Sequence, residues 1–152
     1  MPRLLSVLLA FLLWLLVACS SESPSPADRE PPPFPGSAGA NAWRLEDDPP
    51  EGFGPGTAGF ASPGSLLEAL LSDVVQRDEG LPEGTRLSGG MLEESSDTAT
   101  AWVYVTGMLD DSVAGAEIRL LMRSAPAGWY IDQLSRRNHC RRGVDLARDL
   151  CV

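Results

Sequence analysis

The clearest periodic pattern in the chain lies between residues 63 and about 77, where apolar positions recur at intervals of three and four. This stripe contains Leu66, Leu67, Leu70, Leu71, Val74 and Val75. Such spacing predicts an amphipathic helix. Ser62 suits the N-cap and Pro63 the first helical position, while Gly80 and Pro82 end the helical pattern.

The residues after the helix predict an antiparallel meander of four strands, at about 85–92, 98–108, 113–124 and 129–136. The third strand alternates most cleanly. Its apolar face carries Ala114, Ala116, Ile118, Leu120 and Met122, and its other face carries Gly115, Glu117, Arg119 and Arg123. This alternation is typical of a sheet with one buried face and one solvated face.

A single helix with an apolar stripe must cover the apolar face of such a sheet. We therefore expect the stripe from Leu66 to Val75 to pack on Ile118, Leu120 and Met122. The predicted fold class is α+β, with one N-terminal helix packed on a curved antiparallel sheet of about four strands. The domain that folds this way is expected to span residues 61–152.

Another apolar stretch stands at the N-terminus, from Leu4 to Val17, with Ser6 as its only polar residue and Arg3 before it. A spanning helix usually needs about 18 or more apolar residues, so this run has the proportions of a signal peptide. Its end, Leu16-Val17-Ala18-Cys19, resembles the lipobox of bacterial lipoproteins. The alternatives are an ordinary secretory signal with an incidental Cys19, and an uncleaved anchor helix.

The lipoprotein resemblance implies removal of residues 1–18 and acylation of Cys19, with palmitate among the expected acyl groups. Membrane lipid would then be a partner through Cys19. It also implies an extracytoplasmic, lipid-anchored location in the bacterial cell envelope. Ser20 directly after the cysteine, rather than Asp, implies the outer membrane in a diderm host; a monoderm host would place the protein on the outer face of its cell membrane.

Residues 19–60 are rich in proline and glycine, and nine of the 13 prolines lie between Pro24 and Pro55. Such a composition buries too little apolar surface to offset the entropy of ordering, so it predicts a disordered tether. Three bulky residues, Phe34, Trp43 and Phe53, interrupt it. They either dock on the domain, or contact lipid headgroups, or do neither.

Two cysteines remain beyond Cys19. In an exported chain, Cys140 and Cys151 predict one disulfide, with a single helical turn over residues 145–150 inside the loop. A metal site would have to use His139 and Asp149, and the paired spacing of zinc ligands is missing. We expect no metal and no cofactor.

The formal charge of −9 makes nucleic acid an unlikely class of partner. One segment is nevertheless strongly basic, because Arg136, Arg137, Arg141 and Arg142 fall within seven residues. This patch suits an anionic polymer or an acidic face of an envelope protein. The alternative is that these arginines pair within the molecule, for example with Asp145 and Asp149.

No arrangement of residues predicts catalysis, and we expect a protein that is not an enzyme. Asp110 and Asp111 are adjacent in a turn, where aspartates usually accept hydrogen bonds from nearby backbone amides. His139 is the single histidine, and we expect it on the surface with no catalytic role.

The step Gly128-Trp129-Tyr130-Ile131, together with the order of elements over residues 63–136, resembles cystatin-like and nuclear-transport-factor-like proteins. This resemblance implies a sheet curved around the helix and leaves two hypotheses. The first is a non-catalytic, envelope-associated binding module that uses the solvated face of the sheet. The second is a small-molecule carrier or enzyme, whose pocket would be lined by Trp102, Tyr104, Trp129 or Tyr130 and reached by Asp132 or His139.

Overall fold

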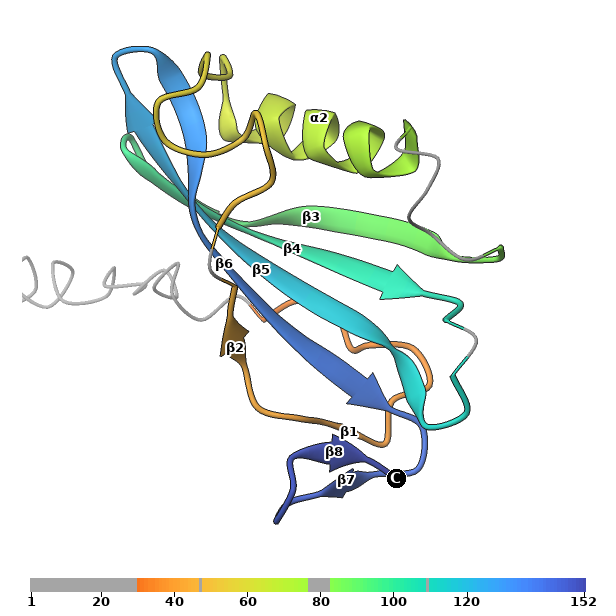
Figure 1. Ribbon diagram of the computed structural model, residues 1–152. Coiled ribbons are helices and arrows are strands. Elements are labelled where there is room, and N and C mark those ends of the chain that lie inside the picture. Colours follow the sequence, from red (N-terminus) through yellow and green to blue (C-terminus); the bar gives the residue numbers. More distant parts are fainter. Residues whose placement is uncertain (1–29, 47, 77–82, 109) are drawn as a thin grey trace, which may run out of the picture.

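The computed structural model describes residues 30–46, 48–76, 83–108 and 110–152. Within them, the helix α2 (Pro63–Gln76) lies across an antiparallel sheet of six strands (Figure 1). The predicted α+β class is confirmed, although the sheet has six strands rather than about four. Among the described residues, no helix combines the length and the apolarity needed to cross a membrane.

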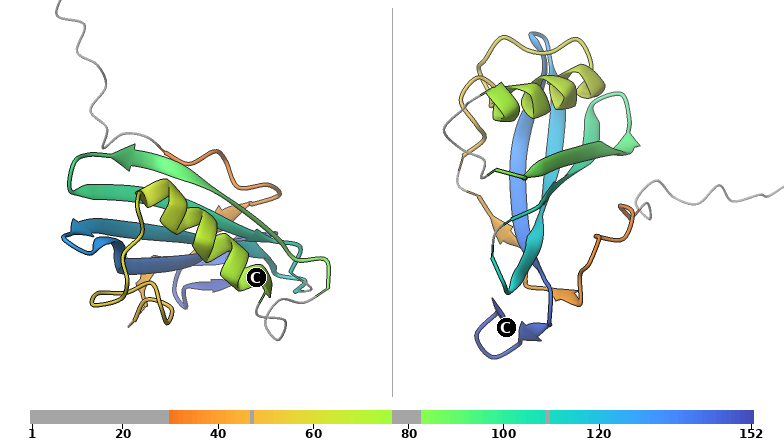
Figure 2. Two further views of the ribbon diagram at one scale, coloured as in Figure 1. Left: turned by 90° about the horizontal axis from the view of Figure 1, so that it is seen from above. Right: turned by 90° about the vertical axis from the view of Figure 1, so that its right-hand side faces the viewer.

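The four predicted strands form the body of the sheet. They are β3 (Arg86–Glu94), β4 (Thr98–Thr106), β5 (Val113–Ala125) and β6 (Gly128–Cys140), in the spatial order β6-β5-β4-β3. They curve together beneath the helix (Figure 2). β6 continues past its predicted end at Arg136, because its basic last residues, which lack an alternating pattern, still pair with β5: Asn138 lies opposite Ala116 and His139 opposite Gly115.

The two additional strands come from the segment that was predicted to be a disordered tether. β1 (Gly39–Ala40) and β2 (Arg44–Leu45) both pair with the outer edge of β6. Further along the same edge, the Ile131 amide donates to the Phe53 carbonyl at 2.7 Å, and Phe60 exchanges backbone hydrogen bonds with Trp129. We call residues 30–60 the strap. The predicted tether is therefore wrong for the strap, and its first part, residues 19–29, lies outside the described residues.

Two aromatic side chains explain why a segment so rich in proline and glycine is ordered. Phe34 and Phe53 are only 7% and 6% exposed, and each belongs to a hydrophobic cluster of the domain. Few residues of the strap can extend a regular strand, but these anchors supply apolar burial, and the open edge of β6 supplies backbone partners. An unpaired edge is a liability that proteins commonly cover in this way.

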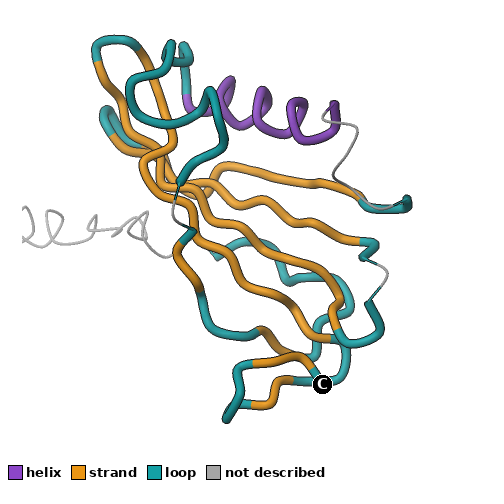
Figure 3. The backbone as a smooth tube through the Cα atoms, in the orientation of Figure 1, coloured by secondary structure: helices purple, strands orange, loops and turns teal. Residues whose placement is uncertain are grey.

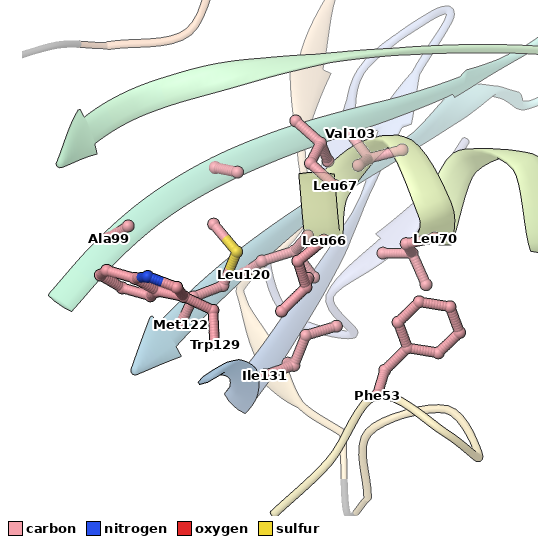
Figure 4. Packing of buried hydrophobic residues seen from close by; sticks show 11 residues of the cluster. Phe53, Leu66, Leu67, Leu70, Ala99, Val103, Leu120, Met122, Trp129 and Ile131 are labelled. Atoms are coloured by element: carbon pink, nitrogen blue, oxygen red, sulfur yellow. The ribbon is translucent and has the colours of Figure 1, made fainter. Parts of the chain in front are cut away.

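The main core lies between α2 and the end of the sheet that the helix covers (Figure 4). Leu66 is fully buried, and the cluster around it contains Leu67, Leu70, Leu120, Met122, Ile131, Trp129 and the strap residue Phe53. The predicted packing of the helix on Leu120 and Met122 is confirmed. Val75 departs from it: this side chain is 65% exposed, because it lies at the margin of the apolar stripe.

The C-terminal residues form a small hairpin, β7 (Val144–Asp145) and β8 (Leu150–Cys151), at the end of β6 farther from the helix (Figure 3). The Cys140–Cys151 disulfide closes it, as predicted. The predicted helical turn over residues 145–150 is wrong, because the two ends of this loop pair as strands. Asp149 contacts the strap, accepting hydrogen bonds from the Ala42 amide at 2.7 Å and from Arg44 at 3.3 Å.

The packing at Leu66 gives the first testable prediction. Leu66→Ala removes a fully buried side chain from the centre of the helix–sheet interface, so the free energy of unfolding should fall by about 2–5 kcal/mol. Val75→Ala is the matched control, because the same helix exposes that side chain to solvent. Urea unfolding followed by circular dichroism measures both. Equal losses in the two variants would contradict this packing.

Candidate functional site

An apolar cavity of about 310 Å³ lies between α2 and the sheet. Its origin is a difference in length. The 14 residues of α2 span about 21 Å at 1.5 Å per residue, whereas the 13 residues of β5 span about 43 Å. The helix therefore covers only about half of the apolar face, and the cavity lies at the helix's C-terminal half, where Leu71 and Val74 are only partly buried.

Ten of the twelve described residues that line this cavity are apolar. Leu71 and Val74 come from the helix, and the sheet contributes Leu87 of β3, Val103 and Val105 of β4, and Ile118 of β5. Surfaces of this kind, with a few polar groups at fixed positions, are typical of sites for small molecules.

The two polar lining residues are Thr85 and Arg136. The Thr85 hydroxyl is buried and has no hydrogen-bond partner within the described ranges. Arg136 pairs in register with Ile118 and so lies on the helix-facing side of β6, with its side chain exposed. The cavity therefore has an apolar wall, one unsatisfied hydroxyl and one guanidinium.

On the opposite face of the sheet, Glu117 is fully buried at the centre of a cluster of charged and polar groups. Its Oε2 atom accepts hydrogen bonds from Arg137 Nε at 2.8 Å and from His139 Nε2 at 2.9 Å. Arg119 Nε lies 3.5 Å from the other carboxylate oxygen. A buried carboxylate requires such partners, because charge without compensation is costly away from water.

The strap covers this cluster. Phe34 stacks on the His139 ring with centroids 4.0 Å apart, and the Ser37 hydroxyl lies 2.9 Å from His139 Nδ1. Trp43 lies against the guanidinium groups of Arg119 and Arg137, at 4.9 and 4.5 Å from the ring centroid. These contacts answer the question left open for Phe34 and Trp43, which both dock on the domain.

Two sequence-based expectations are therefore corrected. The face of the sheet predicted to be solvated is covered around Glu117, and His139, predicted to lie on the surface, is only 7% exposed. The reason is the same in both cases: the strap folds back over this face. Gly115 admits it, because a Cβ atom there would lie 2.5 Å from Phe34 Cζ.

Burial and hydrogen bonding set the charge states in this cluster. Burial lowers the pKa of His139, and the positive charge of Arg137 lowers it further, against the opposing hydrogen bond to Glu117. Burial alone would raise the pKa of Glu117, but hydrogen bonds from His139 and Arg137 outweigh it and hold that pKa below its usual value. The cluster thus consists of an ionised Glu117, a neutral His139 and two flanking arginines.

Ser37, His139 and Glu117 stand in the hydrogen-bond order of a hydrolase relay. The arrangement differs from a working relay in two respects. Phe34 covers the imidazole face, and Arg137 shares the carboxylate oxygen that His139 contacts. None of the three cavities described for this structure includes Ser37. The contacts themselves fasten the strap to the sheet, and this is the role that the geometry supports.

The structure separates the four arginines of the predicted basic patch. Arg136 lines the apolar cavity, and Arg137 is held by Glu117 on the other face. Arg141 donates to the carbonyls of Asp110 and Met108, and Arg142 to that of Val152. Alternating residues of β6 point to opposite faces, so Arg136 and Arg137 meet only in a cavity at the edge of the strand. Arg141 and Arg142 line a different cavity, beside Asp110 and Asp111.

The remaining candidate residues lie outside the apolar cavity. Trp129 is in the main core, and Tyr104 and Trp102 are in the cluster beneath the strap. Asp132 pairs with Arg123, at 2.8 Å. Asp110 accepts from the amides of Ser112 and Val113, which confirms its predicted role in the turn. Within the described ranges, no group of three or more histidine, cysteine or acidic side chains is placed to hold a metal ion.

The cluster around His139 predicts a pH dependence of stability. The lowered pKa of His139 means that the unfolded chain, with a pKa of about 6.5, binds a proton before the folded state does. The free energy of unfolding should therefore be highest above about pH 7 and fall as the pH drops through 6.5 towards 5. Melting temperatures measured between pH 5 and 8 test this expectation.

His139→Gln is the matched variant, because it keeps a side chain able to hydrogen-bond Glu117 but does not titrate. The slope between pH 5 and 7 should then shrink, while any remaining loss at lower pH follows Glu117, whose lowered pKa acts with the same sign. An unchanged slope in the variant would show that other groups cause the pH dependence.

Comparisons with family models, with curated proteins and with solved structures return no match to this chain. Function must therefore be inferred from the residues of this chain. Two features of the described domain bear on it: the apolar cavity beside α2, and the fastened strap that closes the opposite face.

Proposed function

We propose that this chain is a lipid-anchored, non-catalytic binding protein of the bacterial cell envelope, and that its domain holds a small apolar ligand between α2 and the sheet. The observation that carries the second part is the cavity of about 310 Å³ with ten apolar lining residues. A concave, mostly apolar surface of this size is typical of sites for small molecules.

The cavity is favoured over the sheet surface as the binding site for two reasons. The face opposite the helix is occupied by the strap around Glu117 and His139, both of which are buried. The arginines that would attract an anionic polymer point in different directions, and two of them lie beside Asp110 and Asp111. The charge is thus dispersed, whereas the apolar lining is continuous.

The position in the cell is proposed from the sequence alone. The apolar run from Leu4 to Val17 and the lipobox-like Leu16-Val17-Ala18-Cys19 support export and acylation. Cys19 lies outside the described residues. The disulfide between Cys140 and Cys151 is consistent with an oxidising compartment, because disulfides persist mainly in exported proteins.

Filling the cavity tests the binding proposal. Val74→Trp places an indole at the cavity wall, so binding of the uncharged fluorescent probe N-phenyl-1-naphthylamine should weaken at least about tenfold, a loss near 1.4 kcal/mol. Val75→Trp is the control, because the neighbouring side chain is exposed and does not line the cavity. A wild-type protein that does not bind the probe, or equal effects of both variants, would contradict the proposal.

The anchor is tested separately. Cys19→Ser removes the thiol that the acyl chain requires, so the protein should move from the membrane fraction to the soluble extracytoplasmic fraction. Each buried methylene of an acyl chain contributes about 0.8 kcal/mol, which makes the expected shift nearly complete. Cys151→Ser, which removes a disulfide thiol instead, should stay with the membrane. Unchanged partitioning of the Cys19 variant would rule out lipidation at that residue.

A further inference from the structure

A second, polar cavity adjoins the apolar one and shares a residue with it. It has a volume of about 190 Å³ and is lined by Asn41, Arg44, Glu46, Arg136, Arg137 and Asn138. We call it the notch. It lies where the strap leaves the edge of β6 between β1 and β2. Arg136 lines both cavities and therefore lies at the boundary between the apolar one and the polar one.

Two of the four charged groups in the notch already have partners. Arg137 is bound to Glu117, and Arg44 forms an exposed pair with Asp149 at 3.3 Å. The side chain of Arg136, in contrast, forms no hydrogen bond or ion pair with any residue that the structure describes. It therefore supplies an uncompensated positive charge at the boundary between the two cavities.

A side-chain amide adds a second unsatisfied group. The Oδ1 atom of Asn138 is buried and has no partner in the described part of the chain. Its backbone is fixed, because the Asn138 amide donates to Asn41 Oδ1 at 2.7 Å and its carbonyl accepts from the Asn41 amide. The hydrogen bonds between Asn41 and Asn138 therefore hold this wall of the notch in place.

We infer that the ligand of the apolar cavity is a straight-chain carboxylate, whose tail lies between α2 and the sheet and whose carboxylate is bound by Arg136 in the notch. This inference rests on the proposed function and specifies its ligand. The planar guanidinium of arginine matches a carboxylate in a two-point contact. One unpaired cation, with Glu46 nearby as an opposing negative charge, fits a head group with a single negative charge better than a phosphate dianion.

The volume of the apolar cavity sets the length of the tail. A methylene group occupies a volume similar to that of a water molecule, about 30 Å³, so about 310 Å³ holds roughly ten carbons. Decanoate is therefore the probe of matching size. Decanol is the neutral analogue of the same length, and decyl phosphate carries the larger charge.

Isothermal titration calorimetry at pH 7.5, with the full-length protein carrying Cys19→Ser, separates these possibilities. Decanoate should bind about tenfold more tightly than decanol, as expected for one charge-assisted hydrogen-bonded pair. Arg136→Gln should reduce this ratio to about twofold or less, whatever its effect on the affinity for the apolar tail that the two ligands share. Arg123→Gln is the control, because Arg123 pairs with Asp132 away from both cavities, and the ratio should stay at the wild-type value.

A second variant changes the net charge of the notch in the opposite direction. Glu46→Gln removes the negative charge from the notch, so the affinity for decanoate relative to decanol should rise about twofold, an effect typical of an exposed charge. Equal binding of decanoate and decanol by the wild-type protein would overturn the carboxylate inference and leave the apolar site standing. Tightest binding of decyl phosphate would overturn the choice of head group, and binding of none would contradict the proposed function itself.

Discussion

A helix of 14 residues cannot cover one face of a sheet whose central strands contain 13, because a strand advances more than twice as far per residue as a helix. This mismatch governs the arrangement of the domain. Where α2 contacts the sheet, Leu66, Leu120 and Ile131 are fully buried. Beyond that contact, the same apolar face forms the wall of a cavity. The core and the candidate site are therefore two parts of one surface.

The strap solves the corresponding problem on the other side of the molecule. It supplies the edge of β6 with backbone partners and sends Phe34 to one face and Phe53 to the other. Beneath it, the buried Glu117 is neutralised by Arg137 and hydrogen-bonded by His139. Such a cluster contributes little net stability compared with apolar packing. The cluster does specify where the strap lies, because Ser37 contacts His139 Nδ1 and Phe34 stacks on the imidazole ring.

The sequence was informative wherever a residue's role depended on its own neighbours. The helical stripe from Leu66 to Leu70, the alternation in β5 and the pairing of Cys140 with Cys151 all follow from local spacing, and the structure contains them. The strap could not be predicted in this way, because its order depends on Phe34 and Gly115, which are far apart in the chain. The separation of Arg136 from Arg137 could not be predicted either. Neighbouring side chains point to opposite faces only within a strand, and β6 extends beyond the predicted end at Arg136.

The strap also limits how far the domain can stand from a membrane. Packing from Glu30 onwards leaves only 11 residues, 19–29, between the proposed acyl anchor and the folded body. Eleven residues reach at most about 40 Å, whereas a free segment of 42 residues would have allowed a much larger range. In the proposed lipid-anchored protein, so short a linker would confine the domain to a thin layer above the bilayer and raise its effective concentration there. An amphiphilic ligand would then pass between the domain and the lipid surface over a short distance, without diffusing across the compartment.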